Sequence, residues 1–263
     1  MISRAATAMG STTTVEAIRR ALGPVGAFLP VPTISAPPAD LQRDAVRRLE
    51  RAGYRAAWTN EGIGKDAFVQ LAVLLAATEK MAFGTGIANI WARSPQTTHG
   101  AAALLAQAYP GRVVLGLGVG YPEQAASVGR EYGTPLATMR DYLEQMTGPA
   151  QLPAPDAAYP CIIAANGPKM LTLAGEITDG AMPAMVQPEF TAQARRLLGP
   201  DKLLVILVAA SIGQGATATI TATVREHIAA GADHVTVGMP IGTDFTTGVN
   251  HLEQLAPALL EPI

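Results

Sequence analysis

The sequence predicts a single α/β domain, a (β/α)8 TIM barrel in which eight parallel strands are surrounded by helices. Apolar runs bounded by Gly or Pro alternate with segments of helical periodicity, and this alternation occurs eight times in 263 residues. The apolar runs are continuous, which is typical of strands covered on both faces. The chain also has the length of one such barrel. A doubly wound open sheet is the alternative.

The first half of the chain contains four strand–helix units. GPVGAFLP (23–30) predicts a buried strand, and residues 37–54 carry apolar residues at helical spacing between a Pro-rich start and Gly53. The next three strands are expected at 54–59, 81–90 and 112–120, followed by helices at 65–80, 94–111 and 136–146. A short helix at 14–22 precedes the first strand and is expected to cap the barrel floor.

The second half repeats the pattern. Strands are expected at 159–165, 180–186, 202–210 and 233–239, and their helices at 168–177, 188–199, 218–231 and 250–260. We therefore expect one barrel domain over 15–263, preceded by a flexible tail over 1–14.

Composition excludes several classes of protein. The charged residues are balanced, with 19 basic and 21 acidic, so no basic surface for nucleic acid is expected. No apolar run is long enough for a membrane span, and the first residues lack the apolar core of a signal peptide. Cys161 is the only cysteine, which fits a protein of the reducing cytoplasm.

The stretch VVLGLGVGYPEQ (113–124) is the most distinctive in the chain. Gly116, Gly118 and Gly120 do not form a dinucleotide-binding motif, because Tyr121 stands where the third glycine should be. Glycines at every second residue lie on one face of a strand and let a flat ligand approach the backbone. A tapering barrel interior that needs small residues is the alternative. Both are compatible if Gly116 is structural and Gly118 and Gly120 lie near a ligand.

The carboxyl ends of barrel strands are where chemistry is expected, yet they carry no metal-type cluster, and we assign no metal site. His99, His227 and His251 fall in helices, the last two on predicted solvated faces, and His234 falls on the barrel floor. We therefore expect a cofactor to supply the chemistry. AANGPKM (164–170) predicts a phosphate site, since a strand leads through Gly167 to a helix N-terminus. An ordinary turn is the alternative.

Four stretches together resemble the bacterial-luciferase-like oxidoreductases, and most of all the subgroup that depends on deazaflavin coenzyme F420. They are FGTGIANIWARSPQTTHGAAAL (83–104), GRVVLGLGVGYPEQAASVGREYGTPLATMRDYLEQM (111–146), AANGPKMLTLAGEITDGAM (164–182) and REHIAAGADHVTV (225–237). The resemblance implies a (β/α)8 barrel. It also implies a non-prolyl cis peptide at Gly86–Ile87, which props the back of the cofactor ring.

The resemblance also implies a set of site residues. The cofactor-binding residues are expected to be Asn60, Gly86, Ile87, Ala88, Asn89, Gly118, Gly120, Ala165, Asn166 and Gly167. The sugar-phosphate dehydrogenases of the superfamily carry His and Glu where this chain has Glu61 and Tyr121, which argues against a sugar-phosphate substrate. Glu61 is the candidate catalytic acid–base residue by position, and a solvated loop acid is the alternative. Arg93 is expected to hold an anion or to pair with a nearby acid.

The expected function is hydride transfer between F420 and a small organic substrate. An FMN-dependent monooxygenase and a cofactor-binding barrel without turnover are the alternatives. The nearly all-apolar helices 65–80 and 95–109 predict a homodimer. The connection after the seventh predicted strand is shorter than the resemblance implies. We therefore expect a shallow, open pocket around 211–215 and weak turnover.

Overall fold

The computed structural model describes residues 12–32, 36–148, 154–211, 213 and 215–261, and all structural statements refer to these ranges. The helices are α1 (Thr12–Leu22), α2 (Ala39–Arg51), α3 (Ala67–Leu75), α4 (Pro95–Ala108), α5 (Pro122–Ser127), α6 (Pro135–Thr147), α7 (Pro168–Ile177), α8 (Pro188–Leu198), α9 (Ala216–Ala229) and α10 (Phe245–Leu259). The strands are β1 (Val25–Phe28), β2 (Ala56–Thr59), β3 (Ala82–Thr85), β4 (Ala88–Asn89), β5 (Val113–Gly118), β6 (Cys161–Ala164), β7 (Gly180–Met182), β8 (Leu203–Ala209) and β9 (His234–Gly238).

The strands form a closed parallel barrel. Their order is β3-β2-β1-β9-β8-β7-β6-β5-β4, and a further pairing between β3 and β5 closes the ring. The strand expected at 81–90 is divided into β3 and β4, which together occupy one position in the barrel. The prediction of a (β/α)8 barrel is therefore confirmed, and the doubly wound alternative is wrong.

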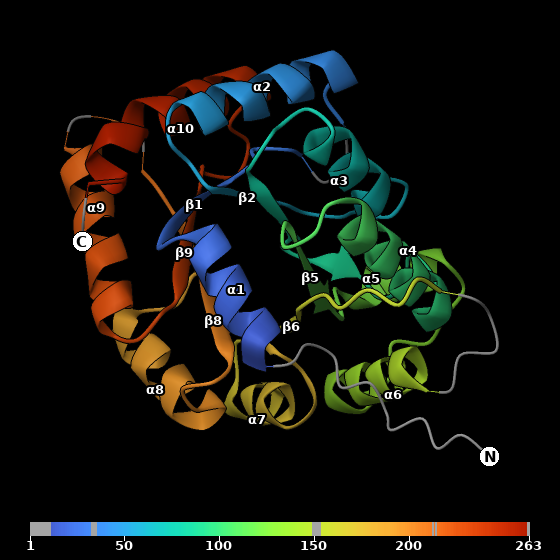
Figure 1. Cartoon of the computed structure of the whole chain (residues 1–263). Coiled ribbons are helices and arrows are strands. Elements are labelled where there is room, and N and C mark those ends of the chain that lie inside the picture. Colours follow the sequence, from blue (N-terminus) through green and yellow to red (C-terminus); the bar gives the residue numbers. More distant parts are fainter. Residues whose placement is uncertain (1–11, 33–35, 149–153, 212, 214, 262–263) are drawn as a thin grey trace.

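The hydrophobic core has two layers. Inside the barrel, Trp58, Val114 and Ile162 pack with Ile18 and Leu22 of α1. A larger outer layer lies between the strands and the surrounding helices. Figure 1 shows the ring of helices and, in front of the strands, α1 lying across the barrel. Since α1 precedes β1 and packs on the inner core, it closes the amino-terminal end, as predicted.

The element boundaries differ from expectation in three places. α3 covers only part of 65–80: the Asp66 side chain caps its start by accepting hydrogen bonds from the Phe68 and Val69 N–H groups, and its C-cap is Ala76. α5 is an additional short helix after β5. α1 starts within the segment 1–14 that we expected to be a tail, and residues 1–11 lie outside the described residues.

No helix in the described ranges combines the length and the apolarity that crossing a membrane requires.

Candidate functional site

Strand pleating decides which side chains line the barrel at the carboxyl ends of the strands, a region we call the barrel mouth. Alternate residues of a strand point inward, and the inward-facing Trp58 and Met182 belong to the inner core. Phe28, Ile87 and Leu207 pack on this core and are only partly buried. These three side chains give the mouth an apolar floor.

The interruption between β3 and β4 forms a bulge at residues 86–87. The Gly86–Ile87 peptide bond is cis, as predicted. A Cβ on Gly86 would lie 2.6 Å from Phe28 Cε2 and 2.9 Å from Met182 Cε, so this position requires glycine. β4 resumes with Ala88, which is buried and pairs with β5. The bulge leaves Ile87 half-buried at the mouth.

The glycines at the end of β5 make room for neighbouring protein groups. A Cβ at Gly116 would collide with the backbone of β3, and one at Gly118 would lie 2.5 Å from Ile87 Cδ1. Gly120 has a φ of +56°, which favours glycine, and its Cβ would lie 2.8 Å from Asn89 Nδ2. Gly118 thus shapes the mouth through the Ile87 side chain, while Gly120 accommodates the end of β4.

Glu61 is buried, with only 4% of its surface exposed. Its Oε1 accepts a hydrogen bond from the Ala67 N–H at 2.7 Å, and its Oε2 accepts one from the Asn89 N–H at 2.8 Å. The Arg93 guanidinium donates to the same two oxygens at 2.5 and 3.0 Å. The alternative of a solvated loop acid is therefore wrong, because burial and four donors fix this carboxylate.

Arg93 extends this network away from the mouth. Its guanidinium lies 3.0 Å from Asp66 Oδ2 and stacks 4.7 Å from the centroid of the Phe68 ring. On the other side, the Glu61 N–H donates to the Ile87 carbonyl at 3.2 Å. Glu61 therefore fixes the backbone of the bulge through its hydrogen bonds with Ile87 and Asn89. This arrangement suits a positioning residue better than the acid–base residue that we expected.

Asn60 directly follows β2, at the carboxyl end of the strand. The Asn60 amide donates to the Val31 carbonyl at 3.1 Å and accepts a hydrogen bond from Lys65 Nζ. Burial lowers the pKa of Lys65 to about 8, although the charge of Glu61 acts in the opposite direction. Sequence reasoning missed Lys65, because a loop lysine just before a helix gives no signal of burial.

The loop after β6 joins two strand ends. Ala165 is buried, and the Asn166 side chain donates to the Ala184 carbonyl at 3.1 Å and accepts from the Ala184 N–H at 2.9 Å. Gly167 is the N-cap of α7 without a side-chain cap, and no atom lies within 4 Å of where its Cβ would be. A hollow of about 790 Å³ beside it is lined in part by Gly167, Lys169 and Arg140. The free N–H groups of this helix end suit an anion.

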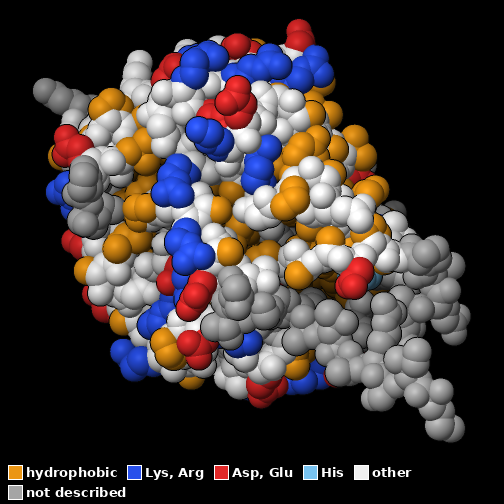
Figure 2. Space-filling model, in the orientation of Figure 1, with side chains coloured by type: hydrophobic (Ala, Val, Ile, Leu, Met, Phe, Trp, Pro, Cys, Tyr) orange, Lys and Arg blue, Asp and Glu red, His pale blue; other side chains and the backbone are white. Residues whose placement is uncertain are grey.

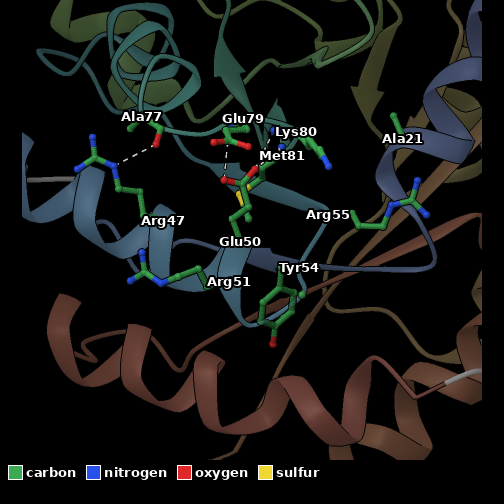
Figure 3. A pocket seen from close by; sticks show the side chains of 11 residues that line it. Ala21, Arg47, Glu50, Arg51, Tyr54, Arg55, Ala77, Glu79, Lys80 and Met81 are labelled. Atoms are coloured by element: carbon green, nitrogen blue, oxygen red, sulfur yellow. Dashed lines mark hydrogen bonds between the residues drawn. The ribbon is translucent and has the colours of Figure 1, made fainter.

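A second hollow, of about 720 Å³, lies at the opposite end of the barrel, where β2 and β3 begin. Figure 3 shows Arg47 and Arg51 on one side of Glu50 and Arg55 on the other. The Glu50 carboxylate already accepts the N–H groups of residues 79–81, and Arg47 donates to the Ala77 carbonyl. Figure 2 shows that basic and acidic side chains are mixed on this face. Its basic side chains do not point toward a common centre. We therefore assign this hollow a structural role.

The histidines have structural partners. His227 is buried and its Nδ1 lies 2.8 Å from Thr191 Oγ1, so the expectation of a solvated face is wrong. His234 lies on the barrel floor as expected, where its Nε2 accepts from Trp58 Nε1 at 3.0 Å. Among the described residues, no group of three or more His, Cys, Asp or Glu side chains could hold a metal ion.

Curated relatives of this chain act with methanopterins and mycolic acids. A 5,10-methylenetetrahydromethanopterin reductase of Methanolobus tindarius is 29% identical over 151 residues, which cover 51% of this chain and 46% of that protein. An F420-dependent hydroxymycolic acid dehydrogenase of Mycobacterium tuberculosis is 30% identical over 197 residues, 63% of this chain and 52% of that protein. The chain spans about half the length of the curated relatives it matches.

The fold is also found among solved structures. An F420-dependent secondary alcohol dehydrogenase in complex with an F420–acetone adduct superimposes with a TM-score of 0.70 at 16% identity, covering 90% of this chain and 98% of that chain. This likeness shows the fold alone. The model of the luciferase-like monooxygenase family matches residues 24–199, more than half of the chain. The chain therefore belongs to the luciferase-like monooxygenase family.

Proposed function

We propose that the chain is an oxidoreductase that transfers a hydride between coenzyme F420 and a small organic substrate. The observation that carries this proposal is the platform at the barrel mouth. Ile87 of the bulge forms part of the apolar floor, Gly118 of β5 makes room for its side chain, and Glu61 in the loop after β2 holds its carbonyl. A flat tricyclic ring fits such a platform, and relatives that are named for F420 support this cofactor.

We assign the cofactor phosphate to the N-terminus of α7. Its N–H groups are free of any side-chain cap, Gly167 leaves the approach open, and Lys169 adds a positive charge at the hollow. The Asn166 side chain is already engaged, since both of its hydrogen bonds are made with the backbone of Ala184. We therefore propose that residues 165–167 contribute mainly their backbone to the cofactor.

Bound F420 would supply the hydride, which no side chain of this protein can provide. The protein would hold the ring on Ile87, keep its other face open to the substrate, and reduce the access of water through the apolar floor. Glu61 fixes the Ile87 carbonyl and the Asn89 N–H and so keeps this support in place.

Titration with F420 and with FMN, followed by ring fluorescence, tests the proposal. We expect F420 to bind more tightly than FMN and to be oxidised or reduced with at least one substrate of a carbonyl, alkene and imine panel. Tighter binding of FMN with oxygen consumption would establish the monooxygenase alternative. Tight F420 binding without turnover on the whole panel would establish a binding barrel.

Gly167→Val tests the phosphate site separately. The new side chain fills the approach to the N-terminus of α7 and pushes the anion off the amides. A charge-assisted hydrogen bond contributes about 1.5–3 kcal/mol, so we expect F420 affinity to fall about tenfold or more. Unchanged thermal unfolding would show that the fold is intact, and unchanged affinity would contradict the site.

We also propose that the protein acts as a homodimer in the cytoplasm. Val69 of α3 and Leu104 of α4 are large apolar side chains with 64% and 56% of their surface exposed. A second copy that covers α3 and α4 would remove both from water. Cys161 is a free, buried thiol, which is compatible with a reducing compartment.

A further inference from the structure

Met185, in the connection between β7 and α8, has a backbone conformation that methionine rarely adopts. Its φ is +55°, and among the described residues it is the only one other than glycine with a positive φ. Glycine avoids the strain of this left-handed region, whereas a larger side chain does not. Such strain persists only where the surrounding structure enforces it, and it is concentrated at active sites and ligand-binding sites.

Hydrogen bonds on both sides enforce this conformation. The Met185 N–H donates to the Leu207 carbonyl at 2.8 Å, and the Leu207 N–H donates to the Pro183 carbonyl at 3.0 Å. The Asn166 carboxamide holds both backbone groups of Ala184. The backbone of Met185 is therefore fixed directly beside Leu207, whose side chain forms part of the apolar floor.

The Met185 side chain lies uncovered at the edge of the mouth. Ala184 pairs with Leu207 of β8, which packs on the inner core, so Ala184 also faces inward. Val186 packs on the outer core beneath the helices. Met185 stands between these two layers, and 59% of its surface is exposed.

β8 lies opposite the bulge across the barrel. β3 and β4 share one position of the closed ring, and β8 is four positions away from it in either direction. A cofactor ring held on Ile87 therefore turns its free face toward Leu207 and Met185. This is the side on which the proposed hydride transfer needs the substrate.

The connections on this side carry almost no charge. Those after β7, β8 and β9 consist of residues 183–187, 210–215 and 239–244, and Asp244 is their one charged residue. Its carboxylate caps α10 by accepting the Thr247 N–H. These three segments therefore offer no basic side chain to a carboxylate or phosphate of the substrate. By contrast, Lys169 follows β6, on the side of the proposed phosphate site.

We propose that Met185 contacts the substrate and sets its specificity, and that the substrate is an uncharged molecule whose apolar part packs on Met185 and Leu207. This inference rests on the proposed function, because it assigns the substrate side of the same mouth. A thioether side chain is flexible and polarisable, and it packs well against aliphatic and aromatic groups. A charged group placed there would lose water without gaining a partner.

Oxidation of Met185 tests this contact without turnover. The protein loaded with oxidised F420 is exposed briefly to hydrogen peroxide, and the sulfoxide at each methionine is measured by mass spectrometry. Met185 should react, whereas Met182, with 3% of its surface exposed, should not. The probes are para-methylacetophenone and para-acetylbenzoate, which differ by a methyl group in place of a carboxylate. The neutral probe should slow the oxidation of Met185 about fivefold or more, and the charged probe less than about twofold. Equal protection by the two probes, or protection by neither, would overturn the proposal.

Met185→Lys should shift the preference between the two probes. The ratio of their kcat/KM values should move toward para-acetylbenzoate by about tenfold, because the new charge pairs with the carboxylate and the apolar contact is lost. If neither ketone is reduced, their competition with a reacting substrate gives the same ratio. Leu197→Lys, in the last turn of α8, makes the same change at another exposed apolar residue and should leave the ratio unchanged.

Met185→Gly separates substrate contact from stability. Because glycine adopts a positive φ without strain, the unfolding temperature should not fall. The affinity for para-methylacetophenone should fall about tenfold, whereas F420 affinity should change less than about threefold. A lower unfolding temperature with unchanged probe affinity would show that the side chain is structural and would overturn the proposal.

Two results distinguish failure of this inference from failure of the proposed function. If the parent chain does not bind F420, the proposed function is wrong and the inference falls with it. If F420 binds but Met185→Lys leaves the preference between the probes unchanged, the inference alone is overturned.

Discussion

Gly118 shapes the mouth through another residue. A Cβ at this position would lie 2.5 Å from Ile87 Cδ1 and Cγ1. Gly118→Ala should therefore displace the Ile87 side chain and lower F420 affinity about tenfold. Overpacking of this kind costs about 1–3 kcal/mol of stability. Fluorescence titration and denaturant unfolding measure the two effects.

Gly175→Ala provides the matched control for Gly118→Ala. Gly175 lies within α7, and its Cβ would meet the Leu197 carbonyl at an ordinary distance of 3.5 Å. Alanine in a helix is about 0.5–1 kcal/mol more favourable than glycine. The control should keep F420 affinity and gain stability, and an equal loss of affinity in both variants would show that Ile87 is not the cause.

Glu61 should affect cofactor binding through the bulge. Glu61→Gln removes the negative charge between Arg93 and two backbone N–H groups, and breaking a buried pair costs about 3 kcal/mol. We expect F420 affinity to fall about tenfold in a variant that remains folded.

Asp66→Asn is the control for Glu61→Gln, because it weakens the other Arg93 ion pair without touching the bulge. This pair is partly exposed, so the loss of stability should stay below about 1 kcal/mol. F420 affinity should not change. Equal losses of affinity in both variants would assign the effect to Arg93 instead of Glu61.

Asp179 predicts a pH dependence of stability. Burial raises the pKa of Asp179 to about 7, although a hydrogen bond from the Cys161 N–H acts against this shift. Because the folded state holds this proton more tightly than the unfolded chain, the stabilisation is complete below about pH 4 and is lost as pH rises to about 7.

Asp179→Asn removes this titration. The free energy of unfolding of the variant, relative to the parent, should rise by about 2 kcal/mol between pH 5 and pH 8. His234 has the opposite sign, since burial lowers its pKa to about 4, but it is present in both proteins and cancels in the difference. A difference that does not change with pH would show that Asp179 is ionised throughout.

At the scale of elements, the apolar runs were sufficient to predict every barrel strand. Periodicity could not predict the division into β3 and β4. This division depends on the close packing of Gly86 against the side chains of Phe28 and Met182. The burial of Glu61 depends on Arg93, which is distant in sequence. Lys65 is held by Asn60, a contact that only the folded loop creates. Local pattern thus predicts the scaffold, and the polar contacts at the mouth need tertiary structure.

The exposed apolar side chains of α3 and α4 lead to a prediction about the proposed dimer. If a second copy covers Val69 and Leu104, a charged residue there should separate the subunits. Leu104→Glu should give half the parent's mass by light scattering at micromolar concentration. Leu197→Glu, at another exposed apolar position on α8, should keep the parent's mass. A parent protein that is itself monomeric would contradict the dimer.

For the whole molecule, the openness of the mouth depends on the connection between β8 and α9. This connection consists of residues 210–215, of which 212 and 214 lie outside the described residues, so the expected pocket at 211–215 is only partly described. On either side, Met185 before α8 and Ile241 before α10 are large, exposed apolar side chains. Neither is covered by the described part of the chain, which supports an open side of the mouth.

This openness predicts that bound cofactor remains accessible to solvent. Iodide should quench the fluorescence of protein-bound F420 nearly as strongly as that of free F420, because the described residues between β8 and α9 form no helix or strand that could wall the mouth. Turnover should be slow for the same reason, since an open site positions the substrate loosely and excludes water poorly. Protection of the bound ring from iodide would show that another segment or a partner closes the mouth. Fast turnover with strong quenching would show that solvent access to the cofactor does not slow turnover. It would mean that the platform at Ile87 positions the reactants without a closed pocket.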